Sequence, residues 1–249
     1  MLGKHLLLSQ YTQESLASQA VPGLGTLGQT HVDTLAITWL CMGGILLAAA
    51  ALKPRLVANG PGGAGQAVAE GLYAFVTDLA KGQIGHKYRT FLPLIAAIFI
   101  FVLIANLAGI GPWRALEFVH IPWMTMPNGH PYEIASPTTD FNVTFGLAMV
   151  SLLVYIGAGI AAHGGQYVKL LLTNPVEWLD LIIRPSTLAL RLMLVITADE
   201  ITRMVFLLLA PALAPTAVMA FEIFIAVIQA FVFALLTGIY IGMAVSEHH

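Results

Sequence analysis

Apolar residues gather in five long segments of the chain, with shorter polar stretches between them. A membrane-spanning helix needs roughly 20 apolar residues, because an α-helix rises about 1.5 Å per residue and the hydrocarbon core is about 30 Å thick. Five segments meet this requirement: residues 35–52, 91–113, 141–167, 175–209 and 217–245. The pattern predicts an all-α membrane protein with five transmembrane helices. Residues 35–249 would form one polytopic membrane domain, and residues 1–34 would lie outside the membrane.

The segment 66–84, between the first two predicted spans, has a different pattern. Its apolar side chains recur at helical spacing, at Val68, Leu72, Phe75, Val76 and Leu79. Three charged residues stand around them: Glu70, Asp78 and Lys81. This arrangement is typical of an amphipathic helix that lies in the membrane interface. We therefore expect residues 66–84 to lie on the membrane surface and not to cross it.

The composition indicates a chain that is mostly surrounded by lipid. Of the 249 residues, 58% are hydrophobic and 10% are charged, whereas a soluble domain has about 25% charged residues to solvate its surface. The net charge of -2 gives no reason to expect a nucleic acid as a partner. Cys41 is the one cysteine, which excludes an internal disulfide and a cysteine-based metal cluster. No cofactor is predicted.

Basic residues predict the orientation of the chain in the membrane. Most of them fall in the connections after the first and third spans, at Lys53, Arg55, Lys81, Lys87, Arg89 and Lys169. By the positive-inside rule these connections face the cytoplasm, or the stroma or matrix of an organelle. The N-terminus would then lie outside and the C-terminus inside.

Charged residues inside the fourth span are candidates for function. A charge in the bilayer costs at least roughly 2.5–3.5 kcal/mol on insertion scales, so such residues must face protein or water. Asp199 and Glu200 stand four and three residues before Arg203, and a local ion pair is the favoured interpretation of Arg203. Arg184, next to Pro185, is expected to extend toward the cytoplasmic headgroups.

Arg191 lacks such a partner in its own helix. The residues three and four positions away are uncharged: Thr187, Leu188, Leu194 and Val195. Arginine keeps its proton in proteins, so Arg191 is a permanent cation in the middle of a span. We expect its partner to come from another helix or another chain. Glu177, about 21 Å earlier along the helix, could line an aqueous path on the cytoplasmic side.

The last span has a stripe of polar residues. Glu222, Gln229, Leu236 and Tyr240 follow one another at spacings of seven, seven and four. The stripe fits a path of titratable and hydrogen-bonding groups. Alternatively, Tyr240 belongs to the interfacial belt and Gln229 forms interhelical hydrogen bonds. The second interpretation is favoured for Tyr240 alone. The first is favoured for Glu222, a carboxylate without a local cation.

Together these residues resemble subunit a of F-type ATP synthases, from about residue 61 to the C-terminus. The resemblance is carried by Arg184 to Leu192, by Ala198-Asp199-Glu200, by Phe221-Glu222, by Ile228 to Phe231, by Leu236-Thr237 and by Tyr240. Further matches are Asn106-Leu107 and Pro137 to Asn142. The Ala-Asp-Glu run and the His-His ending look more like the cyanobacterial and plastid branch.

The resemblance implies an ion-conducting stator subunit and not an enzyme. In this family the last two spans form a tilted hairpin against a rotating ring of small c-type subunits, and b-type subunits of a peripheral stalk connect it to the catalytic head. Arg191 matches the essential arginine that meets the ring carboxylate. The outer half-channel would be lined by Glu200, Glu222, Gln229, Asn106, Thr138, Asp140 and Asn142. Glu177 matches an acid of the cytoplasmic half-channel, and Asp199 and Tyr240 are further candidates for the ion path. The membrane would be a bacterial inner membrane or a thylakoid.

One departure from the family concerns the residues after Arg191. Met193-Leu194-Val195 stands where the family usually has Phe-Gly-Asn, so helix packing there must differ. A secondary ion-coupled transporter is the main alternative function, but the chain contains no repeated halves. The choice between H⁺ and Na⁺ belongs to the ring carboxylate, which lies on another chain.

Overall fold

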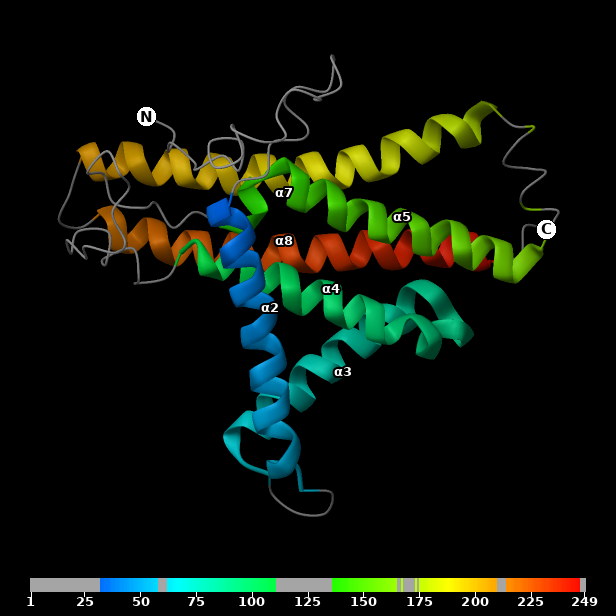
Figure 1. The fold of residues 1–249 in the computed structure, drawn as a ribbon, viewed down its shortest axis with the longest axis horizontal. Coiled ribbons are helices and arrows are strands. Elements are labelled where there is room, and N and C mark those ends of the chain that lie inside the picture. Colours follow the sequence, from blue (N-terminus) through cyan, green and yellow to red (C-terminus); the bar gives the residue numbers. More distant parts are fainter. Residues whose placement is uncertain are drawn as a thin grey trace, which may run out of the picture.

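The computed structural model describes residues 32–57, 62–110, 136–164, 167, 173, 175–209 and 214–246. All regular elements in these residues are helical (Figure 1). The long helices are α2 (Val32–Leu52), α3 (Ala64–Ile84), α4 (Tyr88–Ala108), α5 (Phe141–His163), α7 (Pro175–Leu209) and α8 (Ala214–Val245). Three short 3₁₀ turns are η2 (Lys53–Arg55), η3 (Gly85–Lys87) and η5 (Pro137–Thr139). Within the described ranges, five stretches are long and apolar enough to cross a membrane, and one of them joins α3 to α4. The all-α prediction with five possible spans is confirmed.

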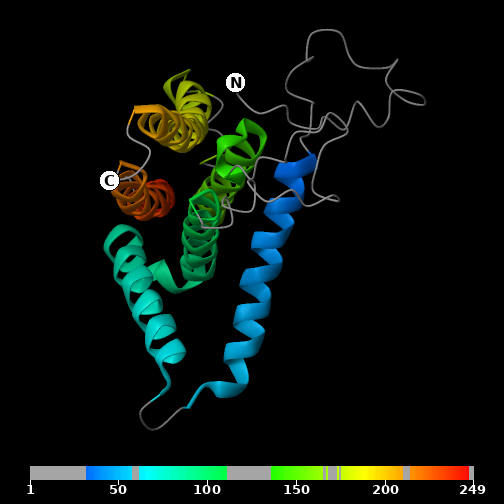
Figure 2. The ribbon, with the colours of Figure 1, turned by 90° about the vertical axis from the view of Figure 1, so that its left-hand side faces the viewer.

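The helices form a bundle with one steeply crossing member. α5, α7 and α8 run along the long axis of the molecule, and α2 stands nearly at right angles to them in both views (Figures 1 and 2). α3 and α4 lie between these two directions and both pack against α8. The bundle of α4, α5, α7 and α8 therefore forms the centre of the molecule.

Small side chains form much of the core. Ala105, Ala226, Ala230 and Ala234 are completely buried, at 0% exposure. Small residues let helix backbones approach closely, which favours packing in lipid because lipid supplies little hydrophobic driving force between helices. A buried hydrogen bond from Ser151 Oγ to Thr237 Oγ1, at 2.7 Å, adds a polar link between α5 and α8.

The connection between α2 and α3 is fixed by a glutamine. α2 ends where Pro54 enters η2, because proline cannot donate the next helical hydrogen bond. The Gln66 side chain then reaches back from the first turn of α3. Its Oε1 accepts from Val57 N and its Nε2 donates to Val57 O, each at 2.9 Å. This double hydrogen bond brings the start of α3 next to the end of α2.

Two glycines position α3 against its neighbours. Gly85 ends α3 with φ of 69°, a conformation that glycine adopts without strain, and the chain turns into α4. Gly242 on α8 faces the Gln83 backbone so closely that a Cβ there would collide with the Gln83 carbonyl oxygen. The α3–α8 contact therefore requires glycine at position 242.

We predict that Gly242→Ala destabilises the protein, because the new methyl group forces α3 away from α8. Overpacking of this kind costs about 1–3 kcal/mol, so the midpoint of thermal unfolding in detergent should fall. Gly157→Ala on α5 is the matched control, since a Cβ there meets nothing within 4 Å. Equal midpoints for the two variants would contradict the close α3–α8 contact.

Candidate functional site

α7 has a continuous exposed stripe that contains Arg191. Its members are spaced three or four residues apart or lie side by side: Thr187, Leu190, Arg191, Leu194, Ala198, Ile201 and Val205. Leu194 is 55% exposed and Ile201 is 50% exposed. On α8, Phe221 and Phe224 are exposed to 60% and 61%. Figure 2, which views α7 and α8 nearly end-on, shows both helices at the edge of the molecule. Arg191 is thus a cation on a mostly apolar outer surface.

The Arg191 side chain forms no ion pair among the described residues of the chain. The ion pair found on α7 belongs to a different arginine, Arg184, whose partner is Asp180. The expectation that its partner comes from another helix or another chain stays a prediction. Arg191 is open to a neutralising group from the exposed side of α7.

A buried polar cluster lies where α4, η5 and α8 meet. Thr138 Oγ1 donates to Asn106 Oδ1 at 2.7 Å, and Asn106 Nδ2 donates to the Ala226 carbonyl oxygen of α8 at 3.4 Å. Ser136 Oγ lies 2.6 Å from Thr138 Oγ1 and donates to the Ala105 carbonyl oxygen at 2.8 Å. Asn106, Ser136 and Thr138 are at most 1% exposed. Buried polar groups of this kind are stable because they satisfy one another.

Glu222 and Asp199 adjoin this cluster. A cavity of about 10 Å³ is lined by Asn106, Gly109, Ile110, Ser136, Ile196, Asp199 and Glu222. Its size is close to that of one water molecule. Glu222 is 2% exposed, so its carboxyl group is held inside the bundle. The structure thus gathers polar residues of α4, η5, α7 and α8 around a space of molecular size.

Local backbone features build the cluster. Gly109 follows α4, and a Cβ there would lie 2.6 Å from the Cβ of Ser136, so only glycine allows this approach. Asp140 is the N-cap of α5, and its Oδ1 accepts from Asn142 N at 2.8 Å. Such a cap satisfies one of the free N–H groups of the first helical turn. The cap accounts for the aspartate at this position and leaves its proposed place in the ion path untested.

Two other predicted residues on this side are half-buried. Gln229 lies two turns after Glu222 on α8, roughly 10 Å further along the helix. Asn142 opens α5 just beyond the polar turn η5. Both are close in sequence to cluster members but do not line the small cavity.

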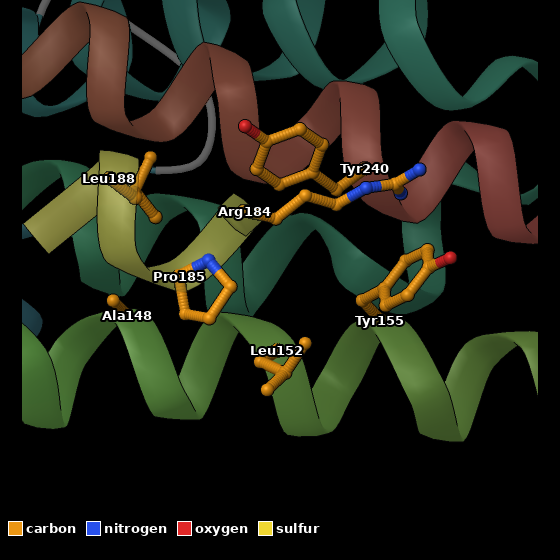
Figure 3. Close-up of a pocket in the computed structure, with 7 residues that line it drawn as sticks. All are labelled: Ala148, Leu152, Tyr155, Arg184, Pro185, Leu188 and Tyr240. Atoms are coloured by element: carbon orange, nitrogen blue, oxygen red, sulfur yellow. The ribbon is translucent and has the colours of Figure 1, made fainter. Parts of the chain in front are cut away.

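A second group surrounds Arg184 at the other end of the bundle. Arg184 Nη2 pairs with Asp180 Oδ2 at 2.6 Å. The guanidinium carbon lies 4.8 Å from the ring centre of Tyr155 on α5 and 5.3 Å from that of Tyr240 on α8. Figure 3 shows the Arg184 side chain extending between these two rings. Cation–π contacts of this geometry are attractive, and more so where water is excluded.

This arrangement corrects the prediction made for Arg184. We expected the side chain to extend toward the headgroups, but it is only 13% exposed and is held by residues of three helices. Asp180, Tyr155 and Tyr240 stabilise the Arg184 charge better than an extended side chain in contact with lipid would. Tyr240 is therefore a packing partner of an arginine and not an isolated interfacial tyrosine.

Arg191 lies between these two groups along α7. It is seven residues after Arg184 and eight residues before Asp199, which corresponds to roughly 10 Å and 12 Å along the helix axis. α8 contributes Glu222 to the first group and Tyr240 to the second. The sequence of groups along the hairpin is polar cluster, exposed cation, then arginine–tyrosine group.

Several predicted residues cannot be placed in these groups. Glu177 and Glu200 belong to α7, but their side chains, like that of Arg203, lie outside the described part of the chain. The pairing expected for Arg203 stays a prediction. Among the described residues, no group of three His, Cys, Asp or Glu side chains could hold a metal ion.

Sequence reasoning missed Ser136, Tyr155 and Asp180 as members of these groups. Ser136 directly precedes Pro137 to Asn142, the segment that resembles the family, and this position could have indicated its role. Asp180 stands four residues before Arg184, a spacing that predicts a helical ion pair. Tyr155 gave no such signal, because its contact with Arg184 is set by the packing of α5 on α7.

Comparison with known proteins gives one consistent result. The family model described as ATP synthase A chain matches residues 34–242. Chloroplastic ATP synthase subunit a of Oedogonium cardiacum is 37% identical over 232 residues, covering 89% of this chain and 85% of the relative. ATP synthase subunit a of Gloeobacter violaceus is 37% identical over 230 residues, covering 90% of this chain and 88% of the relative. The apolar helices, the exposed Arg191 and these matches together show that the chain belongs to the ATP synthase A chain family.

Proposed function

We propose that this chain is the ion-conducting stator subunit of a rotary F-type ATP synthase. Family membership makes it a membrane component of the ATP synthase and not a catalytic subunit. The observation that supports the finer role is the position of Arg191, an exposed cation on an apolar face between two polar groups.

The exposed face of α7 and α8 is the proposed contact with a ring of small c-type subunits. Leu194, Ile201, Phe221 and Phe224 suit an apolar partner. A lone arginine in such a surface costs at least roughly 2.5–3.5 kcal/mol in the membrane unless it is neutralised. A carboxylate on the ring would supply the missing negative charge, and a rotating ring would supply a new one at every step.

The polar cluster around Glu222 is the proposed outer half-channel. Asn106, Ser136 and Thr138 form a continuous set of hydrogen-bonding groups next to this carboxyl group. A water-sized cavity between such groups is suited to the transfer of a cation by stepwise exchange. Further proposed members are Asp140, Asn142, Asp199, Glu200 and Gln229. The path would end near Arg191 and would not cross the membrane.

The cytoplasmic half-channel is proposed to lie on the side of Arg184. Glu177 is the acid assigned to this half-channel. Tyr240, which the Arg184 guanidinium contacts, would lie on the same side. Arg184 and Asp180 compensate each other, so this group adds little net charge to the exit. The two half-channels would be offset along the face of α7.

Arg191 then separates the two paths electrostatically. An ion enters one half-channel, neutralises a ring carboxylate and leaves through the other after nearly a full turn of the ring. The permanent charge of Arg191 repels cations between the half-channels and favours a deprotonated carboxylate beside it. The membrane potential drives the process with about 2.3 kcal/mol per charge per 100 mV.

The lengths of α7 and α8 support a tilted hairpin. The helices have 35 and 32 residues, which correspond to roughly 52 Å and 48 Å at about 1.5 Å per residue. If upright, either helix would extend far beyond a hydrocarbon core of about 30 Å. Both helices should therefore tilt strongly. We propose that the N-terminus faces outside, the C-terminus faces inside, and b-type stalk subunits connect the chain to the catalytic head.

α3 is proposed to lie along the cytoplasmic membrane surface. Its two ends would then react on the same side of the membrane. Single cysteines at Val57 and His86, on a Cys41→Ala background, should both be modified by an impermeant thiol reagent added from the cytoplasmic side. Labelling of the two positions from opposite sides would show that α3 crosses the membrane.

Glu222→Leu should strongly reduce ion-driven ATP synthesis, because it removes the carboxyl group of the outer path. ATP hydrolysis by the catalytic head in detergent should remain nearly intact. Val227→Leu, at an exposed position of the same helix, is the control for a hydrophobic change on α8. Wild-type synthesis rates in well-assembled Glu222→Leu vesicles would remove Glu222 from the path.

Arg191→Ala should abolish ATP synthesis and ATP-driven pumping in an assembled complex. The change removes the barrier between the half-channels, so passive ion leakage should rise. Arg191→Lys keeps the charge without the planar guanidinium and should suppress the leak better than it restores coupling. The measurements are ATP synthesis and pH-gradient decay in vesicles. An assembled Ala variant with near wild-type synthesis would contradict the proposed role.

A further inference from the structure

A groove runs between α3 and α4, lined by Tyr73 and Thr77 of α3 and by residues 88–96 of α4. Its volume is about 570 Å³, whereas the cavities next to Glu222 and Arg184 measure about 10 Å³ each. Cavities of roughly 300–1,000 Å³ are the size that holds small-molecule ligands. The groove is separate from the residues assigned to ion translocation, so its function must be argued independently.

One end of the groove is polar and basic. Arg89 is exposed, and its Nε donates to the Tyr88 hydroxyl at 3.3 Å. Its guanidinium carbon lies 6.0 Å from the Tyr88 ring centre, so the cation is held beside the groove. On α3, the exposed Tyr73 contributes a second phenol. These groups can donate hydrogen bonds to an anion.

The other end of the groove is apolar. Leu92, Pro93 and Ala96 line it along α4. Ala96 lies seven residues after Arg89, roughly 10 Å further along the helix. A ligand in the groove would therefore meet a cation at Arg89 and hydrocarbon further along α4. A phospholipid has this distribution of polarity.

The surrounding charge selects an anionic ligand. Residues 79–89 contain four exposed basic or imidazole side chains, Lys81, His86, Lys87 and Arg89, and no acid. Basic clusters at the cytoplasmic surface attract anionic lipids, by about 1 kcal/mol per Lys or Arg. Tyr73 and Tyr88 also suit headgroup depth, where tyrosine is enriched. Asp78 on α3 is the nearest acid in sequence, and it does not line the groove.

We propose that the groove between α3 and α4 binds an anionic phospholipid of the cytoplasmic leaflet. Arg89 and the hydroxyl groups of Tyr73 and Tyr88 hold the phosphate. The surface of Leu92, Pro93 and Ala96 packs against the start of an acyl chain. The bound lipid joins the end of α3 to the start of α4 and continues the hydrophobic surface of the bundle across the groove.

The test uses the whole ATP synthase complex in phosphatidylcholine vesicles. A photoactivatable phosphatidylglycerol or a matched phosphatidylcholine probe is added in small amount, and adducts are mapped by mass spectrometry. Phosphatidylglycerol should label residues 73–96 preferentially. Arg89→Gln should reduce this labelling about fivefold, the effect of one surface cation. Arg89→Lys should retain most of it, which also checks that the variants fold.

Arg55→Gln is the matched control. Arg55 is an exposed arginine at the end of α2, predicted on the same side of the membrane but outside the groove. Its loss should leave labelling of residues 73–96 unchanged. Equal labelling by the two probes, or an equal decrease in the Arg55 and Arg89 variants, would overturn the proposal. A photoreactive residue at position 73 that captures another subunit in place of lipid would also overturn it.

Discussion

Arg191 places a permanent positive charge on the exposed face of α7. In an apolar environment a lysine can become neutral by losing a proton and a carboxylate by gaining one, whereas an arginine keeps its charge. Its neighbours on the exposed stripe of α7 are mostly apolar, and no described acid pairs with it. We therefore infer that another molecule completes the electrostatic arrangement around Arg191. In the proposed function this molecule is a partner subunit.

Arg184 shows that the charge of an arginine on α7 can be compensated by other described residues, which is not the case for Arg191. The two arginines are seven residues apart on the same helix. Arg184 has an acid one turn away and an aromatic ring from each of two other helices. Its charge is therefore compensated within the chain, where it holds α5, α7 and α8 together. A cation with internal partners stabilises packing, whereas a cation without them is available for an exchangeable carboxylate.

The sequence was sufficient for features that depend on local periodicity. Apolar length predicted the helices that are long enough to cross a membrane. Contacts between helices could not be derived in this way. The placement of Tyr155 beside Arg184 depends on how α5 packs against α7. The need for glycine at 109 and 242 follows from backbone approaches between distant segments. Likewise, Ser136 belongs to the polar cluster because its hydroxyl contacts both Thr138 and the end of α4.

We propose that the counter-charge of Arg191 is a carboxylate of the ring. The most direct measurement is an experimental structure of the assembled ATP synthase in lipid, at a resolution that shows side chains. We expect the stripe from Thr187 to Val205 to face the ring, with the Arg191 guanidinium within about 4 Å of a ring carboxylate or one water away from it. A structure in which this stripe faces lipid, or in which Arg191 pairs with an acid of its own chain, would contradict the account.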